Sequence, residues 1–174
     1  QTVGPVNDYV ALPDGTLVAV GRMTEAAGVL LDGLAFLESG CPATITTLPS
    51  GCGAPSITVT VPELPWLGAT HRIEGSGFAN GSLVAGLVGP QSPGTLLSAL
   101  HPSGLPGCRL LASTEAVLLS GPSTGSTHLD LAIPRNTAFL GVQLYEQFLE
   151  LRLQGTSQPA IGSADGVRLV IGAF

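Results

Sequence analysis

Glu146 and Glu150 are the residues whose type and spacing come closest to a catalytic arrangement in this sequence. They are four positions apart, so an extended strand carries both on one face unless a bulge intervenes. A retaining glycosidase needs two carboxylates about 5 Å apart in a cleft. Charges on a solvated strand face, which prevent edge-to-edge pairing of sheets, explain the same spacing more simply. We therefore expect both glutamates to be exposed structural charges.

Other patterns that would support chemistry are missing from the sequence. Gly75-Ser76-Gly77 lacks the Gly-x-Ser-x-Gly spacing of a hydrolase nucleophile. His71, His101 and His128 are far apart, and no His-x-His, Cys-x-x-Cys or calcium-loop motif is present. Phosphate loops and dinucleotide fingerprints are also missing. We predict a protein that is not an enzyme and that has no catalytic residue, metal site or cofactor.

The charge of the chain excludes further classes of function. All six basic residues are arginines, and they are scattered along a chain with a net charge of −6. The lack of lysine excludes Schiff-base chemistry and the lysine of a phosphate loop. An acidic chain without a basic cluster is not expected to bind nucleic acid or an anionic membrane surface.

Apolar residues are unusually frequent. They make up 44% of the 174 residues, charged residues make up only 10%, and the mean hydropathy is +0.44. No apolar run approaches the ~18 residues of a membrane span, so we expect no membrane insertion. We predict instead that the excess apolar surface meets protein, either another copy of the chain or the rest of a longer one.

Three cysteines, Cys41, Cys52 and Cys108, are typical of a secreted or cell-surface protein with one disulfide and one odd thiol. Free buried cysteines in a cytosolic protein are the alternative. We predict a Cys52–Cys108 disulfide, because Cys52 precedes the expected sandwich and Cys108 precedes an expected core strand. Closing the long loop between them would stabilise the fold by about 4 kcal/mol. The local pair Cys41–Cys52 is the rival.

Glycine and proline punctuate the whole chain, with 24 and 14 copies respectively. Short apolar runs between these turn residues predict an all-β fold. In the run from Ser56 to Val61, the apolar residues Ile57, Val59 and Val61 share one face. The predicted strands are Tyr9–Leu12, Thr16–Arg22, Val29–Leu37, Ala43–Leu48, Ser56–Val61, Thr70–Gly75, Ser82–Val88, Cys108–Ser113, Ala116–Leu119, Thr127–Ile133, Gly141–Leu153 and Val167–Ile171.

Two segments depart from simple alternation. Within Gly141–Leu153 the apolar positions change from even to odd numbers, which predicts a β-bulge near Glu146–Phe148 or a strand that passes from one sheet to the other. Thr24–Leu31 is the one helix candidate, and Gly28 makes it a poor one.

The chain divides into three parts. Residues 1–40 are predicted to form a β-hairpin segment that turns at Pro13-Asp14-Gly15. Residues 41–55, which are rich in Pro, Ser, Thr and Gly, are predicted to be a linker. Residues 56–174 are predicted to form an Ig-like or Greek-key β-sandwich.

Two resemblances extend this interpretation. Leu12–Arg22 followed by Ala26-Ala27-Gly28 resembles one blade of a kelch-like β-propeller, which implies that Leu12–Arg22 and Val29–Leu37 are adjacent antiparallel strands. From Cys41 onward the sequence resembles the C-terminal β-sandwich module of large secreted bacterial surface proteins. That module implies extracellular display, attachment or assembly, and no catalytic residue transfers from it. The stretches that carry the second resemblance are Cys41-Pro-Ala-Thr, Ser50-Gly-Cys52, Leu64-Pro-Trp-Leu-Gly68, Leu105-Pro-Gly-Cys-Arg-Leu-Leu111, Ile133-Pro-Arg-Asn136 and Leu140-Gly-Val-Gln-Leu-Tyr-Glu-Gln147.

These observations favour an extracellular structural or assembly module that acts through protein–protein contacts. A single blade cannot bury both of its faces, so we expect self-association through residues 1–40 into a homo-oligomer or filament. The alternative is a C-terminal recognition or anchoring fragment of a larger secreted β-propeller protein. Trp66 is the candidate platform for carbohydrate, although packing in the core or in a turn accounts for it more simply.

Overall fold

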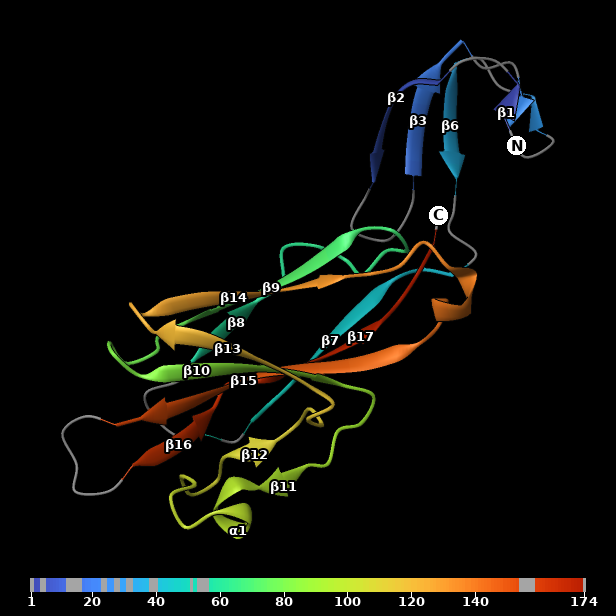
Figure 1. Ribbon diagram of the computed structural model, residues 1–174. Coiled ribbons are helices and arrows are strands. Elements are labelled where there is room, and N and C mark those ends of the chain that lie inside the picture. Colours follow the sequence, from blue (N-terminus) through green and yellow to red (C-terminus); the bar gives the residue numbers. More distant parts are fainter. Residues whose placement is uncertain are drawn as a thin grey trace.

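The computed structural model describes residues 2–3, 6–11, 17–22, 25–26, 29–30, 33–37, 41–50, 52, 57–153 and 159–173. Antiparallel strands dominate these residues (Figure 1). Within the described ranges the helices are the single turn α1 (Leu97–Leu100) and the 3-10 helix η1 (Thr137–Phe139). The all-β prediction is confirmed.

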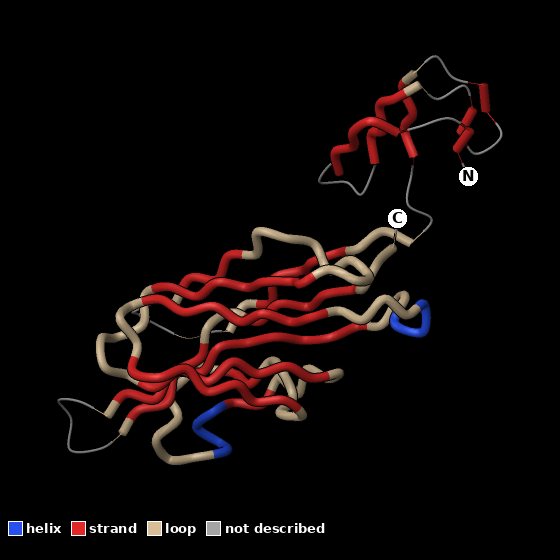
Figure 2. Tube along the Cα trace, turned by 45° about the horizontal axis from the view of Figure 1, so that its top comes forward, coloured by secondary structure: helices blue, strands red, loops and turns tan. Residues whose placement is uncertain are grey.

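Two stacked sheets form a sandwich from residue 41 onward (Figure 2). In the larger sheet the order is β13 (Ala116–Pro122), β10 (Leu83–Gly89), β15 (Gln143–Arg152), β17 (Gly166–Val170) and β7 (Thr44–Leu48), with β16 (Ala160–Ser163) also paired to β15. In the smaller sheet the order is β14 (Ser126–Ala132), β9 (Thr70–Ser76) and β8 (Thr58–Thr60). The chain runs β9, β10, β13, β14 and returns to β9, which is a Greek-key path.

The core lies between the facing sheets and follows the predicted alternation. Ile57 is buried, and Val59 and Val61 pack against the same apolar cluster, as predicted for that face. The rings of Phe78 and Phe148 meet edge to face, with centroids 5.8 Å apart. Members of this cluster from both sheets include Ile73, Leu129, Val84, Phe148 and Val167.

A long excursion between β10 and β13 packs on the outer side of the larger sheet. It contains β11 (Thr95–Leu96), α1 and β12 (Arg109–Leu110), and β11 pairs with β12. Leu97 and Leu111 of this excursion are buried. The excursion therefore shields one end of the outer face of the sheet.

The predicted linker at residues 41–55 is wrong in its first half. β7 pairs with β17 along its whole length, and Ile45 packs against the core. Cys41 forms a bridge with Ala173 near the C-terminus. The sandwich therefore begins at Cys41, because one β-branched alternating run, Thr44–Leu48, is enough to extend the sheet in spite of the prolines around it.

The predicted bulge or sheet switch near Glu146–Phe148 is also wrong. The register between β15 and β10 is continuous from Tyr145 to Leu151. Leu144, Glu146, Phe148 and Glu150 fall on one face by strand periodicity. The apparent change of phase arises because two glutamates occupy core-facing positions.

The described residues of the N-terminal segment form two small sheets. One contains β2 (Val6–Ala11), β3 (Leu17–Gly21) and β6 (Leu34–Leu37), with β3 in the centre. The other contains β1 (Thr2–Val3), β4 (Glu25–Ala26) and β5 (Val29–Leu30). Antiparallel pairing of β3 with β6 confirms that parts of Leu12–Arg22 and Val29–Leu37 are adjacent antiparallel strands. Val29–Leu30 pairs with β4 instead, so the helix candidate over Thr24–Leu31 is wrong where it is described. The predicted turns at Asp14–Gly15 and Gly28 lie outside the described residues.

Candidate functional site

Glu146 and Glu150 are buried, contrary to the expectation that they are exposed. Their exposed fractions are 1% and 0%. They share a face of β15, but four residues at a rise of ~3.3 Å place their backbones about 13 Å apart. Glycosidase carboxyl pairs lie about 5 to 9.5 Å apart on either side of a substrate cleft. The two glutamates instead belong to two separate polar clusters within the sandwich.

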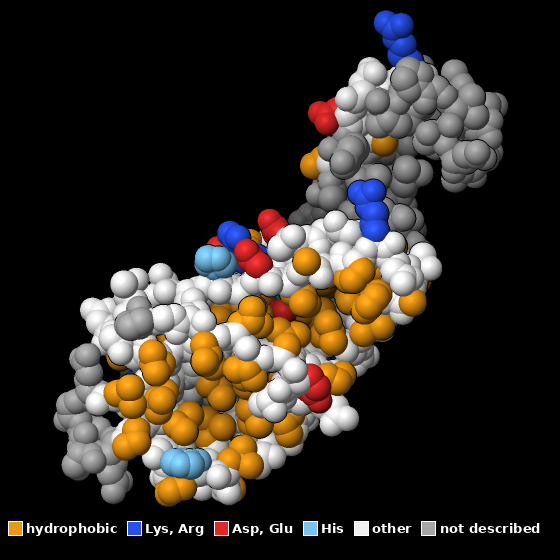
Figure 3. Space-filling model, viewed as in Figure 1, with side chains coloured by type: hydrophobic (Ala, Val, Ile, Leu, Met, Phe, Trp, Pro, Cys, Tyr) orange, Lys and Arg blue, Asp and Glu red, His pale blue; other side chains and the backbone are white. Residues whose placement is uncertain are grey.

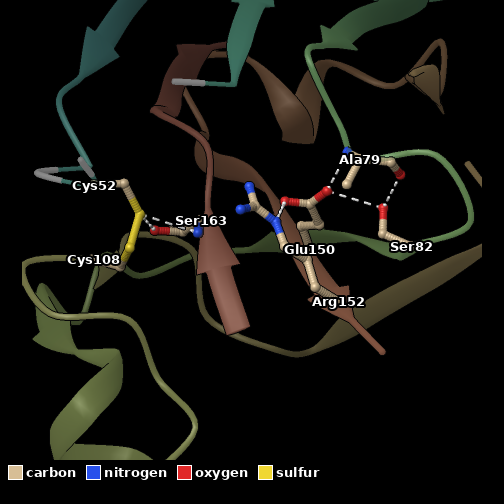
Figure 4. A network of polar contacts seen from close by, with 7 residues as sticks. All are labelled: Cys52, Ala79, Ser82, Cys108, Glu150, Arg152 and Ser163. Atoms are coloured by element: carbon tan, nitrogen blue, oxygen red, sulfur yellow. Dashed lines mark hydrogen bonds and ion pairs between the residues drawn. A yellow bond between two sulfur atoms is a disulfide. The ribbon is translucent and has the colours of Figure 1, made fainter. Parts of the chain in front are cut away.

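Glu150 is the centre of the first cluster (Figure 4). Its Oε1 accepts hydrogen bonds from the backbone N–H of Ala79 at 2.6 Å and from the Ser82 hydroxyl at 2.9 Å. Its Oε2 accepts one from Nε of Arg152 at 2.6 Å. A buried carboxylate with this many donors is compensated for the loss of water. The cluster ties the turn before β10 to β15, which is a structural role.

Glu146 belongs to the second cluster, together with His71 of β9. His71 has an exposed fraction of 0%, and its Nε2 lies 3.2 Å from Oε2 of Glu146. Its Nδ1 lies 2.9 Å from the carbonyl oxygen of Glu63. The pair therefore connects the two sheets through the core. The sequence contained one signal for this pair. By strand alternation, His71 falls on the same face as Ile73, and Glu146 falls on the same face as Phe148.

The predicted Cys52–Cys108 disulfide is present. Figure 4 shows it against Ser163, whose backbone N–H lies 3.2 Å from Sγ of Cys52. Cys41 is exposed and outside the disulfide, so the rival pairing Cys41–Cys52 is wrong. The bridge joins the start of the sandwich to the excursion, at the residue directly before β12.

The three histidines occupy separate places. His71 is buried, whereas His101 and His128 are exposed. Among the described residues no group of three His, Cys, Asp or Glu side chains is arranged to hold a metal ion. Ser76 of the Gly75–Gly77 segment is exposed on the outer side of β9. No helix in the described part of the chain has the length and apolar content needed to cross a bilayer.

The outer face of the smaller sheet is polar. Arg72 donates hydrogen bonds of 2.6 and 2.8 Å to the two carboxylate oxygens of Asp130. These bonds hold the pKa of Asp130 below its usual value. A shallow hollow of about 330 Å³ next to this pair is lined by Thr60, Glu74, Gly75, Ser76, Ser126, Thr127 and His128. None of these lining residues is a Trp, Tyr or Phe on which a sugar ring could stack.

Trp66, the candidate carbohydrate platform, lies elsewhere. It is half-buried in a turn, where its carbonyl accepts a hydrogen bond of 3.1 Å from Ala69. Its backbone forms a parallel bridge with Gly172. This position fits packing in a turn, and carbohydrate binding by Trp66 stays a prediction.

An exposed apolar strand borders the larger sheet. Among the strands that the structure describes, β13 pairs only with β10, which leaves its other side as a sheet edge. Val117, Leu118 and Leu119 of this strand are 50%, 48% and 80% exposed. Natural edge strands usually carry charges, prolines or bulges that prevent pairing with other chains. β13 has no charged residue, and its proline and bulge lie only at its Pro122 end.

The sheet face next to β13 is apolar as well. A hollow of about 210 Å³ there is lined by Leu83, Val84, Ala85, Leu119, Leu149, Glu150, Leu151 and Ile161. Leu149 and Leu151 alternate with the core-facing residues of β15, so this hollow lies on the outer side of the sheet. Figure 3 shows apolar side chains gathered over the sandwich. We define the β13 surface as Leu83, Val117, Leu119, Leu149, Leu151 and Ile161.

The N-terminal sheet carries a second apolar surface. Val20 of β3 and Leu34 of β6 lie directly opposite each other, and both are exposed. Val10 of β2 is exposed too, and its partner Val18 is in phase with Val20. These three residues therefore share one face of the sheet. Within the described residues, β2, β3 and β6 pair only with one another.

The described residues thus offer contact surfaces and buried structural clusters rather than a cleft with reactive groups. The sequence indicated the surplus of apolar residues, but it did not indicate that β13 would lie at a sheet edge. Comparisons with protein-family models, with curated proteins and with solved structures found no match to this chain. Its function is therefore inferred from the geometry above.

Proposed function

We propose that this chain is an extracellular structural module that assembles head to tail with other copies of itself. In this assembly, a strand from residues 1–40 of one copy adds to the free edge of β13 in the next. The observation that carries the proposal is β13, an uncharged and exposed apolar strand at the border of the larger sheet.

β13 is the acceptor in this contact, because the edge of a sheet can bind an added strand. The outward N–H and C=O groups of β13 can pair with an added strand, which supplies affinity without a particular side chain. Val117 and Leu119 alternate with Leu118, so they project toward the outer face that contains Leu149 and Leu151. An exposed apolar area of this kind is typical of a protein interface.

The donor side is supported by the N-terminal sheet. In this sheet of three short strands, Val10, Val20 and Leu34 leave one face apolar and exposed, and a neighbouring molecule could cover that face. Donor and acceptor are different surfaces, so each copy can bind two neighbours. Such heterologous contacts produce a ring if the rotation closes and a filament if it does not.

Two observations support an extracellular location. The disulfide between Cys52 and Cys108 is typical of an oxidising compartment. The resemblance of the sequence from Cys41 onward to modules of secreted bacterial surface proteins points to the same place.

Sedimentation velocity of the full chain over a wide range of concentration tests this function. We expect the average mass to rise with concentration above the 17.5 kDa of one chain. The variant Leu119→Lys should remain monomeric, because it places a charge at the centre of the edge. Leu100→Lys, at an exposed position of α1 and outside the β13 surface, should assemble as the wild type does. A wild type that stays monomeric, or a Leu119→Lys variant that assembles normally, contradicts the proposal.

The antiparallel meander β2–β3–β6 favours a second candidate, a recognition or anchoring fragment of a larger secreted β-propeller protein. Propeller blades are antiparallel sheets of four strands around a central channel. In that case the N-terminal sheet would complete its contacts with blades of the same protein. A chain that is monomeric at every concentration would favour this candidate over self-assembly.

A further inference from the structure

The two sheets of the sandwich leave a groove between them at one border. β13 lies at the border of the larger sheet and β14 at the border of the smaller one, and among the described strands each pairs with one neighbour only. A hollow of about 260 Å³ lies between these two strands and reaches residues of the core. We define the core groove by five residues that line this hollow, namely Gly86, Leu118, Ser120, Leu129 and Phe148.

Leu118 faces this groove and is nevertheless exposed. It lies opposite Gly86, which lies opposite Phe148, so the three residues form one row on the core side of the larger sheet. Phe148 is 1% exposed, whereas Leu118 is 48% exposed. In a sandwich, side chains on the inner faces of the two sheets normally cover each other. The smaller sheet therefore covers the core only as far as Phe148 and leaves the row open at β13.

The groove has the size and chemistry to take an apolar side chain from outside. A cavity of about 150 Å³ lined by apolar side chains is large enough for a benzene ring. The hydroxyl oxygens of Ser120 and Thr127 lie 2.9 Å apart and join β13 to β14 near the turn between these strands. An added side chain would therefore enter along the edges of the two sheets and not from the turn.

The N-terminal sheet contains an edge strand that fits this groove. All four residues of β6 are apolar, and among the described strands β6 pairs only with β3. β2, at the other edge of the same sheet, carries Asp8, whose charge would lose its water in an apolar groove. Side chains alternate along a strand, so an added β6 directs one set into the core groove and the other toward the outer hollow next to Leu119.

We propose that β6 of one copy extends the larger sheet of the next copy at β13 and fills its core groove with an apolar side chain. This inference rests on the proposed head-to-tail assembly and names the strand that is added and the place that receives it. Both strands are sheet edges, so their pairing breaks no strand pair within either copy. Each copy would then complete the core of its neighbour.

Alkylation of a cysteine placed in the groove tests this inference. Leu118→Cys is combined with Cys41→Ser, so that its thiol is the only one outside the bridge between Cys52 and Cys108. The rate of reaction with iodoacetamide should fall about tenfold between dilute monomer and a concentration about ten times the midpoint of assembly. Leu100→Cys with Cys41→Ser is the control. Its position on α1 is exposed and outside the groove, so it should react at the same rate at both concentrations.

This inference and the proposed function fail in different ways. A wild type that stays monomeric removes the proposed function itself. Assemblies in which Leu118→Cys reacts as fast as in the monomer leave head-to-tail assembly in place and overturn the filling of the groove. Leu118→Trp gives a second test, because its indole would occupy the groove and should raise the midpoint concentration of assembly at least about tenfold. Leu100→Trp should leave this midpoint unchanged. Normal assembly of Leu118→Trp also overturns the inference.

Cross-linking identifies the added strand. Chains with Leu34→Cys on β6 are mixed with chains that carry Leu118→Cys, both with Cys41→Ser, and treated with a short bismaleimide. A covalent dimer is expected. Asn7→Cys on β2 is the comparison, because β2 lies two strand spacings, about 10 Å, from β6 and should give little product. A dimer formed through Asn7→Cys and not through Leu34→Cys overturns the assignment of β6.

Discussion

The side-chain oxygen of Gln147 accepts a hydrogen bond of 2.7 Å from the backbone N–H of Leu111. The same side chain donates bonds of 2.9 Å to the carbonyl oxygens of Arg109 and Ala164. One fully buried amide in β15 thus forms hydrogen bonds with three backbone groups of two other segments. Gln147 therefore fixes the excursion and the loop after β16 on the outer face of the larger sheet.

Replacing Gln147 by methionine should destabilise the sandwich by at least about 2 kcal/mol. The new side chain has a similar length, but three backbone groups lose their partners, and each buried unsatisfied group costs about 1–3 kcal/mol. Urea unfolding measures the change. Gln143→Met, on the same strand but at an exposed position, is the control and should change stability by less than about 0.5 kcal/mol. Equal stability of the two variants would show that the contacts of Gln147 do not hold the excursion.

Removal of the disulfide should be costly because it closes a loop of 56 positions. The double variant Cys52→Ser, Cys108→Ser is expected to lose about 4 kcal/mol in the free energy of unfolding. Cys41→Ser should have little effect, because Cys41 is exposed and outside the bridge. Peptide mapping of a non-reduced digest should recover Cys52 and Cys108 in one cross-linked product. Recovery of Cys41 in a cross-link with Cys52 would contradict the structure.

Regular alternation allowed most strands of the sandwich to be predicted from the sequence. His128, Asp130 and Ala132 are outward on β14, and Leu129 is buried, because a half-exposed antiparallel strand has a period of two. Short elements, such as β11, β16 and α1, were missed because two to four residues carry no periodic signal. Their placement depends on tertiary contacts such as those of Gln147 and the disulfide.

The buried glutamates show why the candidate sites were harder to predict than the strands. A glutamate in an apolar run normally indicates the solvent side, and this rule placed both residues of β15 on the wrong face. Burial is possible only because the partners come from distant segments, His71 for Glu146 and Ser82 for Glu150. Sequence spacing contains no information about such partners. The exposure of β13 likewise depends on which strand lies at the border of the sheet.

The ion pair between Arg72 and Asp130 should make a small contribution to acid sensitivity. Because the pKa of Asp130 is lowered in the folded state, the contribution is present above the ordinary aspartate value of about 3.9 and is lost as pH falls through the lower folded value. Arg72→Gln removes the donor and should raise the pKa of Asp130 toward its ordinary value. Carboxyl ¹³C NMR titration measures the shift. An unchanged Asp130 titration in this variant would contradict the role assigned to Arg72.

The central claim, head-to-tail assembly, predicts how two assembly-deficient proteins behave when they are mixed. Leu119→Lys lacks the acceptor edge and keeps the donor, whereas the chain without residues 1–40 lacks the donor and keeps β13. The described strand pairings of the sandwich involve no residue of the segment 1–40, so we expect the shortened chain to retain its sheets. Circular dichroism should confirm a β-sheet spectrum for it.

Sedimentation velocity of the two proteins, separately and as an equimolar mixture, is the most direct measurement. Each protein alone should be monomeric, and the mixture should form a dimer of one chain of each kind that cannot grow further, because only one donor and one acceptor remain. Each protein alone, at the total protein concentration of the mixture, provides the control for non-specific association. A mixture that stays monomeric, or a shortened chain that still self-associates through β13 alone, would contradict head-to-tail assembly.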